Sequence, residues 1–198
     1  MRKLALALLL VAALGLYVGL GRAGSYSFGK TALSGDSIEL DNLAVTATGS
    51  AKLVCAYPAG DIEAGAMRLD SIQAESICVD LVRGKGNELI LKEASAAGGV
   101  VIQARRADRE TNPKGQPITV IRSVHATARS AKLLQDRNTV LLTGSVVVKV
   151  TEPGKTEPLA AIDGQNVTYL LKENKIQIKG QPGKPAEITV TSGEEEKK

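Results

Sequence analysis

The sequence predicts an all-β protein: an antiparallel β-jellyroll or roll built of repeated hairpins, preceded by one apolar export helix at the N-terminus. Three observations carry this prediction. Beyond residue 24, polar and apolar residues alternate in short segments, turn-forming residues separate these segments, and one hairpin-sized motif recurs. The chain has no Trp, one Phe and four Tyr, so we expect a core of Val, Leu, Ile and Ala.

Residues 1–24 have the composition of a targeting segment. Arg2 and Lys3 precede Leu4–Leu20, a run of 17 residues without charge, and small residues surround a cleavage position after Ala23. As a helix this run covers roughly 26 Å, against a hydrocarbon core of roughly 30 Å. It therefore fits either a removed signal peptide or a retained membrane anchor, and the rest of the chain is exported in both cases.

The remainder is expected to form one β domain over residues 25–192, followed by a charged disordered tail at 193–198. Ser37–Asp41, Lys175–Lys179 and Glu187–Thr191 alternate polar and apolar residues, as strands with one buried face do. The segment from Thr139 to Val150 is richer, and its predicted buried face consists of Val140, Leu142, Val146, Val148 and Val150.

A repeated motif indicates stacked hairpins. Asn138–Gly144 and Asn174–Gly180 both follow the pattern N-x-[VI]-x-[LI]-x-G and lie 36 residues apart, and a fainter copy spans residues 74–91. Each copy predicts a strand, a tight turn at Asn and a second strand closed by Gly. One hairpin cannot bury its apolar face alone, so three or more would stack into an elongated roll.

The two cysteines leave two alternatives open. Ile77, Val79 and Leu81 share one face of a predicted strand, which places Cys78 on the other face. In an oxidising compartment Cys55 and Cys78 can form a disulfide, and otherwise they are two unpaired, small apolar side chains.

Composition argues against several classes of function. His125 is the single histidine, so a multi-histidine metal site cannot form. A lone histidine on a probable strand is more often a surface or packing residue than a catalytic base, and no cofactor or catalytic residue is predicted. Aromatic platforms for single-stranded nucleic acid are missing. Without Arg2, Lys3 and Arg22 the chain carries 22 basic and 21 acidic residues, and we expect the small cluster Arg105, Arg106 and Arg109 to lie in a solvated loop. Neither an enzyme nor a nucleic-acid binder is expected.

The stretch from Ala126 to Val190 resembles the OstA-like lipopolysaccharide-transport proteins of the Gram-negative envelope. The resemblance is carried by residues 131–148, 161–172 and 174–180, and it extends more loosely over residues 62–125. One member of that family is a soluble periplasmic bridge protein, and another keeps a single span in the inner membrane. The resemblance therefore implies a periplasmic protein that is either soluble or anchored to the inner membrane by its N-terminal helix.

The resemblance also implies a mechanism. The fold would be a β-jellyroll open along one side, with the acyl chains of lipid A in its interior. End strands would pair edge to edge with neighbouring jellyrolls or with further copies of the chain, and Glu187–Thr191 is the candidate C-terminal edge. The candidate lipid-binding residues are Val140, Leu142, Val146, Val148, Val167, Tyr169, Leu171, Ile176 and Ile178.

Two alternatives stand beside this mechanism. The nine candidates can pack against one another as a closed core, as aliphatic strand faces commonly do. The chain can also be a structural or adhesive exported β-solenoid that binds only proteins.

Overall fold

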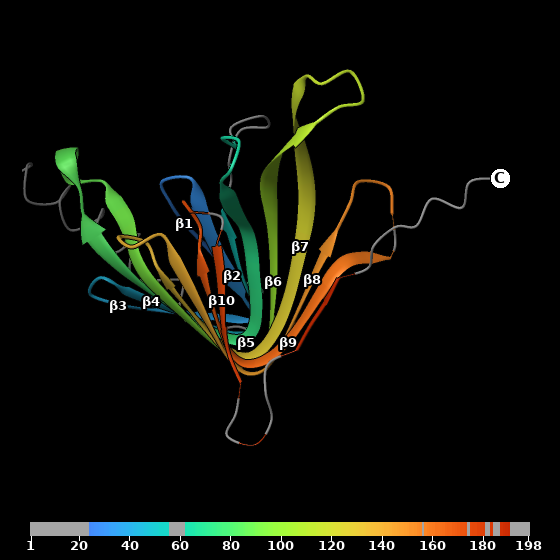
Figure 1. Cartoon of the computed structure of the whole chain (residues 1–198). Coiled ribbons are helices and arrows are strands. Elements are labelled where there is room, and N and C mark those ends of the chain that lie inside the picture. The colour runs from blue at the N-terminus through green and yellow to red at the C-terminus, as the bar shows by residue number, and fades with distance from the viewer. Residues whose placement is uncertain are drawn as a thin grey trace, which may run out of the picture.

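The structure is a computed structural model, and it describes residues 24–55, 62–155, 157–173, 175–180, 183 and 187–190. These residues form one antiparallel sheet of 11 strands, curled into the V seen in Figure 1. The predicted N-terminal helix and the predicted tail at 193–198 lie outside the described residues. Within the described part, no helix is long and apolar enough to cross a membrane.

Long strands dominate the sheet. The N-terminal strands are β1 (Gly24–Phe28), β2 (Thr31–Gly35), β3 (Ser37–Asp41) and β4 (Ala44–Cys55). The central strands are β5 (Met67–Arg83), β6 (Leu89–Thr111), β7 (Pro117–Leu134), β8 (Thr139–Thr151) and β9 (Pro158–Leu170). Two short strands follow, β10 (Lys175–Lys179) and β11 (Glu187–Val190), and one 3-10 turn, Lys85–Asn87, connects β5 to β6. The strand order is β1-β2-β4-β5-β6-β7-β8-β9-β10, with β3 paired to β4 and β11 paired to β9.

A line of β-bulges folds this sheet into two arms. The bulges are at Gly49–Ser50 in β4, Gly98–Gly99 in β6 and Gly144–Ser145 in β8, and all six residues have positive φ. They lie side by side, because each of the five strand pairings from β4–β5 to β8–β9 has one register shift at the same level across the sheet. A bulge bends its strand and increases the local twist. We call this line the crease; Figure 1 shows the strands bending there, at the bottom of the V.

The crease corrects the prediction of a short strand closed by Gly144, whereas β10 ends directly before Gly180 as predicted. Gly144 lies inside β8, with φ of 83°, and β6 is continuous over 23 residues. A bulge and a tight turn both require positive φ, so a glycine in the sequence signals either one. The predicted turn at Asn138 is confirmed, as is the turn at Asn87; both asparagines have positive φ.

The inner faces of the two arms form one continuous aliphatic core. Ile77, Val79 and Leu81 are buried on this face, as the alternation predicted. The predicted buried face of β8 is also confirmed, from Val140 through Val150. The all-β prediction therefore holds, and the expected aliphatic core is present.

The structure separates the two cysteines, so the disulfide alternative is wrong for this fold. Cys55 ends β4 on the inner face, whereas Cys78 on the outer face of β5 lies opposite Thr46. Nine strand positions separate Thr46 from Cys55, which is roughly 30 Å of strand at about 3.3 Å per residue, bent once at the crease. A disulfide needs Cα atoms within about 7 Å. The two cysteines form no disulfide with each other.

Candidate functional site: the aliphatic interior and the junction of its arms

All nine candidate lipid-binding residues belong to the inner face or to its margin. Six of them are between 0% and 4% exposed: Val140, Leu142, Val146, Val148, Val167 and Tyr169. The other three are partly buried and pack against the core: Leu171, Ile176 and Ile178. The structure therefore brings the predicted set together on three neighbouring strands, β8, β9 and β10, with Leu171 in the turn after β9.

Along the crease the two arms are in full contact. Val146 and Val148 expose no surface, so in this conformation they form a packed core rather than an open groove. The alternative of a closed core therefore describes the six candidates that are between 0% and 4% exposed, which are close-packed as protein interiors usually are.

The arms also meet at a second place, far from the crease along the strands. The Met67 N–H donates to the Leu171 carbonyl at 2.9 Å, and the Leu171 N–H donates to the Asn138 carbonyl at 2.8 Å. Met67 begins β5 and Leu171 follows β9, and three other strands separate β5 from β9 in the sheet. We call the contact between Met67 and Leu171 the junction.

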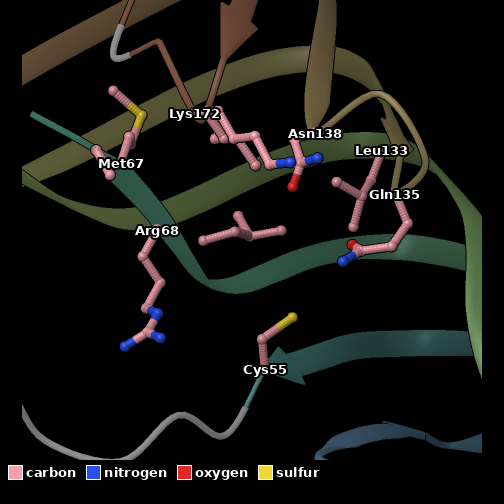
Figure 2. Close-up of a pocket in the computed structure, with 10 residues that line it drawn as sticks. Cys55, Met67, Arg68, Leu133, Gln135, Asn138 and Lys172 are labelled. Atoms are coloured by element: carbon pink, nitrogen blue, oxygen red, sulfur yellow. The ribbon is translucent and has the colours of Figure 1, made fainter. Parts of the chain in front are cut away.

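A cavity of about 260 Å³ lies at the junction. Figure 2 shows Met67 and Arg68 on one side of it, Leu133 and Gln135 on the other, and Cys55 below. The cavity wall is made by Cys55, Ala66, Met67, Arg68, Leu69, Leu133, Gln135, Asn138, Leu171 and Lys172. Two of these ten described residues are basic and none is acidic.

A narrow apolar crevice continues from the junction cavity into the core, and the two spaces share Met67, Leu69 and Leu171. Its volume of about 10 Å³ is close to the minimum for a single water. The wall is completed by Ile102, Ala104, Val124, Ala126, Val140 and Tyr169. Burial raises the pKa of the Tyr169 phenol, although nearby Arg106 acts in the opposite direction, so the hydroxyl stays protonated at neutral pH.

An ion cluster borders the junction on the inner face of β6 and β7. Arg122 is 8% exposed and donates to Asp108 at 2.6 Å, to Glu110, and to Glu152 at 3.4 Å. Burial lowers the pKa of Arg122, but the hydrogen bonds to Asp108 and Glu110 outweigh it and raise this pKa above its usual value. Arg122 therefore carries its charge at any pH at which the protein is folded.

The ion cluster shows where the sequence interpretation of the arginines was wrong. Arg105 and Arg106 lie in β6, not in a loop, and point to opposite faces. Arg105 pairs with Asp70 at 2.7 Å, and Arg106 donates to Asp108 at 2.7 Å. The sequence did contain a signal for this pairing. Residues two apart in a strand share one face, so Arg106 and Asp108 could have been predicted to form an ion pair.

Three comparisons with known proteins bear on this arrangement. The family model described as "Lipopolysaccharide-assembly, LptC-related" matches residues 109–181, which run from the end of β6 to beyond β10. A search of curated proteins finds no match. Among solved structures, the chain is similar to LptH from Pseudomonas aeruginosa, described as the LptA homologous periplasmic component of the lipopolysaccharide transport device. That match has a TM-score of 0.54 and 11% identity, and it covers 82% of this chain and 95% of LptH.

The match to LptH shows a shared fold, and the family model covers most of the strands that carried the resemblance in sequence. The two comparisons agree with each other and with the motif-based resemblance. Residues 109–181 are thus similar to LptC-related lipopolysaccharide-assembly proteins, and the fold is shared with LptH.

Proposed function

We propose that this protein binds lipopolysaccharide by the acyl chains of lipid A and passes it across the periplasm as part of a bridge to the outer membrane. One observation carries the proposal: the nine candidate residues face a single aliphatic interior, on a fold shared with a lipopolysaccharide-transport component. Burial of each CH₂ group contributes about 0.8 kcal/mol, so several acyl chains would supply ample affinity.

Entry of an acyl chain requires the arms to part. Val146 and Val148 are completely buried, so lipid reaches them only by replacing contacts between the arms. At the junction the arms already leave a cavity of about 260 Å³. We place the entry of the lipid at this cavity because the fewest packed contacts have to be replaced there.

Transfer along a bridge would use the two margins of the sheet. β1 and β3 lie at one margin and β10 and β11 at the other, and among the described residues β11 pairs only with β9. An unpaired strand edge offers N–H and C=O groups to another chain. Neighbouring jellyrolls or further copies of this chain would bind there. The N-terminal apolar segment would be either a removed signal peptide or an anchor in the inner membrane.

Site-specific photo-crosslinking tests the lipid interior. Crosslinkers at Val146 and Ile178 should capture lipopolysaccharide, since both side chains belong to the inner face. Their neighbours Val147 and Gln177 alternate to the outer face and serve as matched controls. Capture at neither inner position, or equal capture at inner and outer positions, would disprove a lipid site in the interior.

The competing function is a structural or adhesive β-solenoid that binds only proteins. Its interior would remain the closed core seen at the crease. Native mass spectrometry of the purified protein distinguishes the two functions: co-purifying lipid favours transport, and a lipid-free protein that associates only with proteins favours the solenoid.

A further inference from the structure

The hydroxyl of Tyr169 is a buried polar group without a partner. Tyr169 is 4% exposed, and its hydroxyl has no hydrogen-bond partner among the residues that the structure describes. Buried phenols are normally hydrogen-bonded, and one that is left unpaired costs free energy. An unpaired group of this kind in a binding protein calls for a partner supplied by the ligand.

Water is a poor partner for this hydroxyl. The crevice beside Tyr169 has a volume of only about 10 Å³, and its other wall residues are all apolar. A buried water is stable when it makes two to four hydrogen bonds, and Tyr169 offers one. A polar atom that is covalently attached to an apolar chain suits the crevice better, because the chain itself is favoured there.

The junction cavity next to the crevice is suited to bind a charged part of the same ligand. Lys172 lines it three residues beyond Tyr169, in the turn that follows β9. Lys172 is exposed, and the structure shows no ion pair between it and any described carboxylate. With Arg68 also in the wall and no acidic side chain among the lining residues that the structure describes, the cavity favours an anionic group.

We propose that the junction cavity and the crevice form one oriented subsite for a phosphorylated, acylated lipid. The phosphate lies in the cavity beside Lys172. The Tyr169 hydroxyl donates a hydrogen bond to the carbonyl oxygen of an acyl linkage, and that acyl chain continues into the interior towards Val140. This inference rests on the proposed function and adds to it an orientation of the lipid, with the headgroup at the junction and the chain towards the crease.

Replacing Tyr169 with Phe removes the hydroxyl alone. Tyr169→Phe should weaken the binding of lipid A about five- to tenfold, the effect of one hydrogen bond. Binding of dodecyl phosphate, which has no acyl carbonyl, should not change. The melting temperature of the lipid-free variant should equal or exceed that of the wild type, because no bond within the protein is lost. A clear fall in that temperature, or equal weakening for both lipids, would overturn the assignment.

Replacing Lys172 tests the phosphate end. Lys172→Gln should weaken the binding of lipid A and of dodecyl phosphate together, and should reduce the salt dependence of both. Lys149→Gln makes the same change of charge on the exposed outer face of β8 and is the matched control. Equal effects of the two variants would show that the cavity attracts the lipid only through the net charge of the protein.

The two native cysteines provide a test in the wild-type chain. Cys55 lines the junction cavity, whereas Cys78 lies on the outer face. Lipid A should slow the alkylation of Cys55 severalfold and leave that of Cys78 unchanged. Lipid capture at Val146 without protection of Cys55 would overturn the subsite and leave the proposed function standing. Absence of both capture and protection would overturn the two together.

Discussion

The crease and the junction hold the same two arms together by different means. Across the crease, hydrogen-bonded strands lie side by side, and Val146 and Val148 beneath it expose no surface. At the junction, strands that are not neighbours in the sheet meet through the Met67–Leu171 backbone hydrogen bond and enclose a cavity. The crease is therefore suited to act as a fixed hinge, and we expect the arms to part at the junction when lipid enters as proposed.

Matched leucine truncations should separate the two regions most clearly. Leu142 is 1% exposed near the crease, so Leu142→Ala should lower the free energy of unfolding by about 2–5 kcal/mol, as in other packed cores. Leu171 already borders a cavity and is partly exposed, so Leu171→Ala should cost about 1 kcal/mol. Urea denaturation measures both values, and equal losses would contradict the difference between crease and junction.

The ion cluster tests whether charge helps to close the junction. Arg106 on β6 lies between Met67 on β5 and Arg122 on β7. The ion cluster is therefore next to Met67, which forms one side of the junction. Arg122→Met keeps much of the side-chain volume but leaves Asp108 and Glu110 without their shared cation.

We expect Arg122→Met to lower the free energy of unfolding by about 2–3 kcal/mol, below the full cost of breaking a buried pair because Glu110 is partly exposed. The double variant Arg122→Met with Asp108→Asn should recover part of that loss, since the first change leaves Asp108 paired with Arg106 but facing Glu110 without the cation that the two carboxylates shared. A double variant no more stable than Arg122→Met would show that the cluster acts through packing alone.

Glycine substitutions test the hinge itself. A Cβ at Gly144 would lie 2.7 Å from the Cβ of Arg129, and φ at Gly144 is 83°. At Gly154 φ is 76° and nothing lies within 4 Å. Gly154→Ala should cost about 1 kcal/mol from backbone strain alone, and Gly144→Ala about 2 kcal/mol because strain and the steric clash add. Thermal denaturation measures the difference. Equal losses of stability in the two variants would mean that the crease accommodates a side chain as easily as an open turn does.

Sequence patterns predicted the faces of strands far better than they predicted where strands meet. The alternation over β8 placed Val140 and Val146 on one face correctly, because the period of two is a local property of extended backbone. Gly144 was assigned to a strand end because bulges and turns require the same positive φ. The junction had no signal in the sequence, because the contact between Met67 and Leu171 depends on how the whole sheet curls.

The smallest expected effect is a change in pH dependence at the margin of the ion cluster. Hydrogen bonds from Lys155 and then from Arg122 hold the pKa of Glu152 below its usual value. A carboxylate with a lowered folded-state pKa stabilises the protein above its unfolded pKa of about 4.3, and that contribution is lost as pH falls through the folded-state pKa.

Glu152→Gln should therefore lower the melting temperature slightly at pH 7 and make it fall less steeply between pH 5 and pH 3, measured by circular dichroism. Because Lys155 is the larger cause of the lowered pKa, Lys155→Gln should flatten the same range, and combining the two changes should add little. A profile for Glu152→Gln as steep as that of the wild type would show that the pair Glu152–Lys155 does not couple to folding.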